Sequence, residues 1–169
     1  MTGPDSQSKG AIDGAAIKPS NKPRSAARLA AVQGLYQMDL AATDITEVIA
    51  QFATRFGADG EGGAPEVADR LFFAELLRGV VRRQTDIDPL VDAKLAGGWR
   101  LNRLDSILRA TLRAGAFELL ERRDIPARVI ISEYVDVAKE FFNGEEPKVV
   151  NGVLDKLARE QRPGEVGHG

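Results

Sequence analysis

Apolar residues return every three or four positions along most of the chain, from about residue 24 to residue 157, and this spacing constrains the fold more than any other feature. It is the pattern of amphipathic helices that pack one stripe against a shared core. No convincing alternation of apolar and polar residues predicts a strand, because the short run VIIS (129–132) falls inside a helical pattern. The sequence therefore predicts an all-α bundle of about seven helices with short connections.

Helix boundaries in the first half follow from capping residues, glycine and proline. Asp44 and Glu47 have capping-box spacing and are expected to open the second helix. The run GADGEGGAP (57–65) predicts a loop, and Asp88-Pro89 predicts an interruption because proline cannot donate a backbone hydrogen bond. The predicted helices cover about 24–42, 44–56 and 66–84, followed by a short helix up to residue 95.

The second half contains three more predicted helices. Gly97-Gly98 ends the preceding helix, and Trp99 lies in the connection. Asn102 is expected to cap a long helix that keeps apolar residues on one face as far as Leu119. The other boundaries are a start at Asp124-Pro126, a stop at Asn143-Gly144 and a start at Pro147.

The charge of the chain is unevenly distributed. Residues 1–28 carry a net charge of +3 and the remainder carries −5, which together give the overall −2. A basic segment on an acidic body is typical of nucleic-acid binders, although a disordered leader that improves solubility would look the same. The expected organisation is a flexible basic N-terminal arm over 1–22, an all-helical domain over 23–162 and a flexible tail over 163–169.

Composition excludes several kinds of chemistry. The chain has no cysteine and one histidine, His168, so disulfides, cysteine-based zinc sites and cysteine nucleophiles are ruled out. The glycines at 57–63 lack the Lys-Ser/Thr ending of a phosphate-binding loop. No apolar run reaches the roughly 20 residues that span a bilayer, and the first ten residues have no apolar signal segment. We therefore expect a cytoplasmic protein without catalytic residues, metal or cofactor.

Candidate RNA-binding residues gather at the first predicted helix. Arg24 and Arg28 are one turn apart, so both could hold backbone phosphates, with Lys22 just before them. Tyr36 lies two turns beyond Arg28 and could offer its ring to an unstacked base. The alternative places the arginines in solvent and the tyrosine in the core, and the spacing alone does not decide between them.

Further charged residues admit a structural interpretation. Arg109 and Arg113 are four residues apart on the long helix, where they could bind phosphate or pair with acidic residues of neighbouring helices. The ion pairs are favoured, because Leu108 and Leu112 hold that face near the core. Glu145, just before the last helix, suits the positive end of the helix dipole.

Three segments, in order, resemble the bacterial NusB family. Trp99, Arg113 and Glu118 fall in the family's spacing, and Lys148, Asn151 and Gly152 stand as the family writes them. The resemblance runs from about residue 24 to residue 160. Its segments are RSAARLAAVQGLYQMDL (24–40), WRLNRLDSILRATLRAGAFELL (99–120), and VIISEYVDVAKEFF followed by KVVNGVLDKLAR.

The resemblance implies an all-helical protein of two small lobes that acts in transcription antitermination. NusB proteins bind the boxA element of nascent RNA together with a small-subunit ribosomal protein that doubles as Nus factor E. The complex joins RNA polymerase and promotes transcription of ribosomal RNA operons. By matching positions, the RNA-binding residues would be Lys22, Arg24, Arg28, Tyr36, Glu145 and Lys148.

The sequence departs from the NusB pattern in two places, and two other functions compete with antitermination. Ser25 and Ala26 stand where relatives are often richer in arginine, and Val149 stands where many have phenylalanine. Fewer cations predict weaker RNA binding, which keeps open a protein-interaction module with little RNA binding of its own. The same helical module also begins a family of ribosomal-RNA cytosine methyltransferases, but those need a cysteine and a further cofactor-binding domain. A homodimer is a further option that the sequence leaves open.

Overall fold

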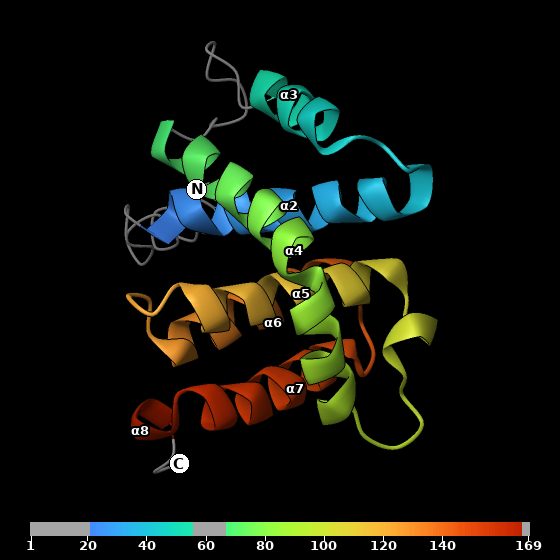
Figure 1. The fold of residues 1–169 in the computed structure, drawn as a ribbon, viewed down its shortest axis with the longest axis vertical. Coiled ribbons are helices and arrows are strands. Elements are labelled where there is room, and N and C mark those ends of the chain that lie inside the picture. Colours follow the sequence, from blue (N-terminus) through green and yellow to red (C-terminus); the bar gives the residue numbers. More distant parts are fainter. Residues whose placement is uncertain (1–20, 56–66, 167–169) are drawn as a thin grey trace, which may run out of the picture.

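The computed structural model describes residues 21–55 and 67–166 (Figure 1). Within these ranges the chain forms seven α-helices, one 3-10 helix and no strand, which confirms the predicted all-α bundle. The predicted arm over 1–22 lies outside the described residues except for Asn21 and Lys22, which belong to a helix, and the whole predicted loop over 57–65 lies outside them. The elements are α2 (Asn21–Ala41), α3 (Ile45–Arg55), α4 (Val67–Lys94), η1 (Leu101–Arg103), α5 (Ser106–Glu121), α6 (Ala127–Phe141), α7 (Glu146–Gln161) and α8 (Pro163–Val166).

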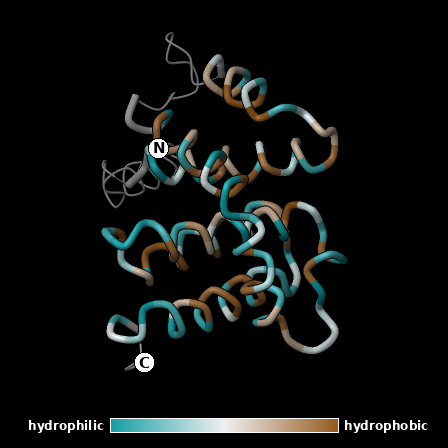
Figure 2. The backbone as a smooth tube through the Cα atoms, in the orientation of Figure 1, coloured by the Kyte–Doolittle hydropathy of each residue, from teal (hydrophilic) through white to brown (hydrophobic). Residues whose placement is uncertain are grey.

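The helices form two groups that α4 joins. In Figure 1, α2 and α3 lie in the upper half, α5, α6 and α7 lie below them, and α4 crosses both groups at a steep angle. Helix α5 contacts α2, α4, α6 and α7, so it is the centre of the bundle. The buried side chains of both groups form one continuous cluster, and Figure 2 shows hydrophobic residues recurring along every long helix.

Two glycines allow close helix packing around α5. A Cβ atom on Gly79 of α4 would lie 2.2 Å from atoms of the Phe117 ring, and one on Gly115 would lie 2.7 Å from Leu154. Any larger residue at these points would force the helices apart. The predicted inward face of α5 is confirmed, since Leu108, Leu112 and Leu119 are fully buried.

Two predicted boundaries differ from the structure. Pro89 lies inside α4 and does not interrupt it, because Ile87 and Val91 are both completely buried and hold the helix against the core on either side of the proline. The cap of α5 is Asp105, whose side chain accepts hydrogen bonds from the backbone N–H groups of residues 107 and 108, whereas Asn102 lies in η1. Both differences arise from tertiary packing that local propensity does not contain.

The chain continues as a short helix, α8, where the sequence predicts a flexible tail. Just before it, Arg162 is buried, and its guanidinium donates hydrogen bonds to four backbone carbonyls at and after the end of α5. The Glu165 carboxylate accepts a hydrogen bond from the N–H of Ala127, the first residue of α6. These contacts attach Pro163–Val166 to the bundle. No helix among the described residues is long and apolar enough to cross a membrane.

Candidate nucleic-acid interface

Arg28 is a buried residue of the bundle. Only 3% of the residue is exposed, and its Nε and Nη2 atoms donate to the two carboxylate oxygens of Glu118 at 2.7 and 2.9 Å. A second carboxylate, that of Glu133, lies 3.2 Å from Nη1. Both interpretations of Arg28 from the sequence, as a phosphate contact and as a solvated cation, place it at the surface, whereas the structure buries it beside Ala27 and Ala31, where α2 packs against α5 and α6.

The same carboxylate of Glu118 also binds Tyr134. The Tyr134 hydroxyl donates to Glu118 at 2.5 Å, and Ser25 donates to Glu133 at 2.6 Å. Burial lowers the pKa of Arg28, but the hydrogen bond and the charge of Glu118 outweigh it and leave that pKa raised. Burial is also the main reason why the pKa of the Tyr134 hydroxyl is raised. Arg28 therefore stays charged and the Tyr134 hydroxyl stays protonated at neutral pH. Their contacts with Glu118 and Glu133 tie α2 to α5 and α6.

Arg24 lies one turn before Arg28 and is partly exposed. Its guanidinium carbon lies 4.9 Å from the centre of the Phe72 ring, which Arg28 and Arg122 also approach at 5.1 and 5.4 Å. The stem and face of Arg24 thus rest on an aromatic ring while part of the side chain meets solvent. Lys22 belongs to the first turn of α2, and its side chain lies outside the described residues.

Tyr36 is half-buried near the other end of α2. It follows Arg24 by twelve residues, so the two lie about 18 Å apart along the helix axis. In Figure 1, α2 begins on the left and ends on the right, where the connection after α4 and the start of α7 also lie. In this view the end of α2, which carries Tyr36, and the start of α7 therefore lie on one side of the molecule, and the start of α2, which carries Arg24, lies on the other.

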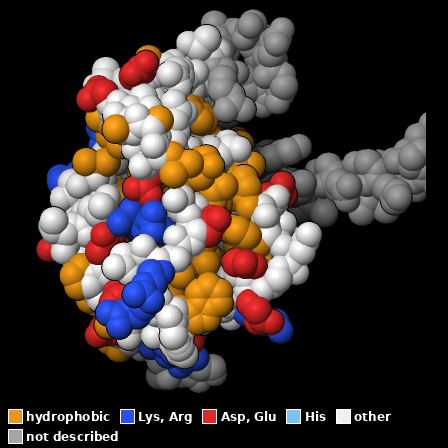
Figure 3. All heavy atoms as spheres, turned by 90° about the vertical axis from the view of Figure 1, so that its right-hand side faces the viewer, with side chains coloured by type: hydrophobic (Ala, Val, Ile, Leu, Met, Phe, Trp, Pro, Cys, Tyr) orange, Lys and Arg blue, Asp and Glu red, His pale blue; other side chains and the backbone are white. Residues whose placement is uncertain are grey.

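Glu145 and Lys148 are exposed at the start of α7. Neither makes an ion pair with another described residue, so the Lys148 ammonium is available to an anion. The face on which α7 begins is turned toward the viewer in Figure 3, where Lys and Arg side chains stand among exposed hydrophobic ones and several Asp and Glu side chains. That mixture of cations and apolar surface suits a single-stranded nucleic acid.

Most arginines elsewhere are paired within the protein. Arg109 donates to Asp39 of α2 at 2.7 Å, and Arg113 binds both oxygens of Asp88 of α4 at 2.8 Å. The predicted ion pairs between helices are confirmed. These arginines stabilise the bundle and are not free to hold phosphate.

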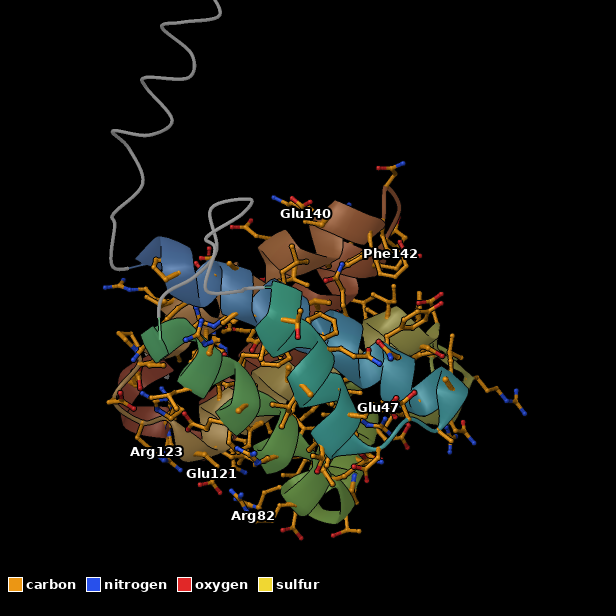
Figure 4. All side chains as sticks on the ribbon, turned by 90° about the horizontal axis from the view of Figure 1, so that it is seen from above. Glu47, Arg82, Glu121, Arg123, Glu140 and Phe142 are labelled. Atoms are coloured by element: carbon orange, nitrogen blue, oxygen red, sulfur yellow. The ribbon has the colours of Figure 1, made fainter. Side chains whose placement is uncertain are left out.

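Basic residues at the α4–α5 edge are interspersed with acidic ones. Figure 4 shows Arg82, Glu121 and Arg123 together on one side of the molecule, away from Glu140 and Phe142. Arg83 makes ion pairs with Asp86 and Glu121. Arg82 and Arg123 make no ion pair with a described residue, so acidic residues offset only part of the positive charge of this mixed edge.

Comparison with known proteins identifies the family. A family model described as the NusB family matches residues 25–159. The chain belongs to the NusB family. Within the family, the transcription antitermination protein NusB of Agrobacterium fabrum is 52% identical over 147 residues, covering 86% of this chain and 88% of that protein. The protein of the same name from Maricaulis maris is 55% identical over 145 residues, covering 84% and 89%.

Solved structures agree with this assignment. The NusB of T. maritima superposes with a TM-score of 0.73 at 29% identity, covering 88% of this chain and 99% of that one. A chain in the crystal structure of a plectonemic RNA supercoil has the same fold, with a TM-score of 0.72 at 24% identity and coverage of 82% and 96%. The protein is thus a member of a family of transcription antitermination proteins, as its sequence motifs predict.

The residues that the NusB resemblance assigns to RNA leave out a neighbouring lysine on α7. Lys156 is exposed and follows Lys148 by eight residues, so both lie on one face of α7 with Gly152 between them. The i, i+4, i+8 spacing was the available signal. That spacing alone does not identify the group, because nothing in the local sequence shows that Trp99 lies beside this face of α7.

Proposed function

We propose that this NusB-family protein is a transcription antitermination factor that binds boxA RNA together with the small-subunit ribosomal protein that acts as Nus factor E. With RNA polymerase, the complex promotes transcription of ribosomal RNA operons. The observation that carries the proposal is the family match over 25–159, supported by relatives about half identical over most of the chain and named for antitermination.

The proposed RNA surface uses the candidate residues other than Arg28. Lys22, Arg24 and Lys148 supply positive charge to backbone phosphates, and Tyr36 and Glu145 supply an aromatic ring and a hydrogen-bond acceptor to unpaired bases. Arg28 is left out, because its guanidinium is occupied by the buried carboxylate of Glu118 and the partly buried carboxylate of Glu133. It contributes by holding α2 in place beside Arg24.

The test is fluorescence anisotropy of labelled boxA RNA, with and without the ribosomal partner, over a salt series. Specific binding that tightens with the partner supports the proposal, and a scrambled RNA of equal length is the control. With the three cations named above, the logarithm of affinity should fall with the logarithm of salt at a slope on the order of −2. Lys148→Ala should weaken binding and make the slope shallower by about 0.7, whereas Lys139→Ala, an exposed lysine near the end of α6, should do neither.

A second candidate is a protein-interaction module with little RNA binding of its own. The observation in its favour is the burial of Arg28, which removes one cation from an arginine-poor first helix. Binding to the ribosomal partner by a folded protein, with no RNA binding in either condition, would select this alternative.

A further inference from the structure

A pocket of about 280 Å³ lies between the end of α4, the connection after it and the first half of α7. Its apolar wall consists of Trp99, Val149 and Val153. Its charged lining consists of Lys94, Lys148 and Lys156, and two glycines, Gly97 and Gly152, leave it open. We call this feature the Trp99 pocket.

The aromatic wall is accessible to solvent. Trp99 is 38% exposed, although tryptophan is the largest apolar side chain and could have been covered by the core. The backbone N–H of Trp99 donates a hydrogen bond to the carbonyl of Ala96 in the connection. A partly open indole ring beside valine side chains offers a flat surface on which a planar group can stack.

Positive charge surrounds this ring. Lys148 and Lys156 are exposed, and neither makes an ion pair with a described residue. Lys94 is largely buried and binds Glu160 at 2.7 Å, so that carboxylate is already neutralised. On the other side of Trp99, the carboxylates of Glu146 and Asp105 are matched by Arg100 and Arg103. The balance of charge around the ring therefore favours an anionic ligand.

Gly152 is the independent indication that the pocket is kept open. It lies in the middle of α7, where glycine is less favourable than any residue except proline. A Cβ atom at this position would meet no other atom within 4 Å, so packing inside the protein does not require glycine there. By contrast, Gly79 and Gly115 have neighbours that a Cβ would strike. Glycine at this position leaves the space between Lys148 and Lys156 open.

We propose that the Trp99 pocket binds one unstacked nucleotide of single-stranded RNA. The base stacks on the Trp99 indole against Val149 and Val153, and the adjoining phosphates are held by Lys148 and Lys156. Ring stacking together with phosphate contacts is the combination by which proteins hold single strands, whereas an acidic peptide would make no use of the flat ring. This inference rests on the proposed function and specifies where the RNA would pass.

The experiment uses the fact that Trp99 is the only tryptophan in the chain. The full-length protein is titrated with the boxA RNA while tryptophan emission and the anisotropy of a label on the RNA are followed together. Stacking quenches indole emission, so the two signals should change at the same RNA concentration. Trp99→Ala should weaken binding by about 5- to 150-fold, the range expected for one base–aromatic stack, and Trp99→Phe should restore most of it.

A second variant fills the space without touching the ring. Gly152→Leu places a good helix-forming residue in the pocket, so the protein should remain folded while RNA affinity falls at least several-fold. Asn151→Leu is the matched control, because it introduces the same side chain one position away, without a change of charge, at an exposed position that does not line the pocket.

The outcomes separate this inference from the function on which it rests. Saturable RNA binding with unchanged Trp99 emission, and with Gly152→Leu binding as tightly as Asn151→Leu, would overturn the pocket while the antitermination proposal stands. Absence of RNA binding in any condition would overturn both. Quenching by the ribosomal partner alone, with none by RNA, would show that a protein occupies the pocket and would also overturn the inference.

Discussion

Replacement of Arg28 tests whether this residue is structural or an RNA contact. In Arg28→Ala, the Glu118 carboxylate would remain fully buried and keep only the hydroxyl of Tyr134 as a donor. Breaking a buried pair by removal of one partner costs about 3–5 kcal/mol, because an uncompensated charge is left in the interior. A domain with total stability of about 5–15 kcal/mol would lose a large part of it.

The assay is urea denaturation followed by far-UV circular dichroism. Arg83→Ala is the control, since Arg83 makes only surface ion pairs and should cost less than about 1 kcal/mol. The apolar triple variant Arg28→Met, Glu118→Leu, Tyr134→Phe removes every charge and hydroxyl at the centre of the network. Its stability should return close to that of the parent, because a buried ion pair contributes little beyond well-packed apolar residues.

Either of two results would refute this reasoning. One is a cost for Arg28→Ala no greater than that of Arg83→Ala. The other is a triple variant as unstable as the single one, which would mean that lost packing, and not the abandoned charge, sets the cost. If Arg28 only supports α2, the fraction of Arg28→Ala that stays folded should bind RNA with the parent's salt dependence. A shallower salt dependence than that of the parent would instead show that Arg28 contacts RNA.

Three further changes test the packing and the tail. Gly79→Ala should destabilise by about 1–3 kcal/mol because its Cβ would strike the Phe117 ring, and a thermal melt equal to that of the parent would contradict the packing described. Leu112→Ala should cost about 2–5 kcal/mol by leaving a cavity in the centre of α5, which denaturant titration would measure. The pKa of Glu165 is lowered mainly by the hydrogen bond from the N–H of Ala127, so its stabilising effect is present above its ordinary value of 4.5 and is lost at lower pH. Urea midpoints of the parent and Glu165→Gln should therefore differ at pH 7 and converge as the solution is acidified, and a constant difference would count against this contact.

The helical bundle was predictable because its information is local. Periodicity and capping residues depend on neighbours in the sequence, and the inward face of α5 followed from them directly. Pro89 was the exception, because the buried residues on both sides of it matter more than its missing hydrogen bond. Local rules fail where a tertiary contact contributes more free energy than the local preference.

The candidate site was harder to predict because it depends on pairs of distant residues. Arg24 and Arg28 have the same side chain one turn apart, yet one is partly exposed and the other is buried. The difference is Glu118, 90 residues further along the chain, and no spacing within the first helix could reveal it. Trp99 and Gly152 present the same problem, because only the folded chain places the connection after α4 beside α7, where both residues line one pocket.

The two kinds of cation have different tasks in this fold. A planar guanidinium can satisfy several oxygens at once, so Arg28, Arg113 and Arg162 can be buried or partly buried in the bundle with two or more nitrogens donating to carboxylates or carbonyls. An ammonium group is strongly hydrated and is costly to bury, so Lys148 and Lys156 stay at the surface. A count of basic residues therefore overstates the charge available to RNA, and the arginines that look most suited to phosphate are those that the fold has already used. The surface to examine for RNA is the one where lysines lie beside an open aromatic ring.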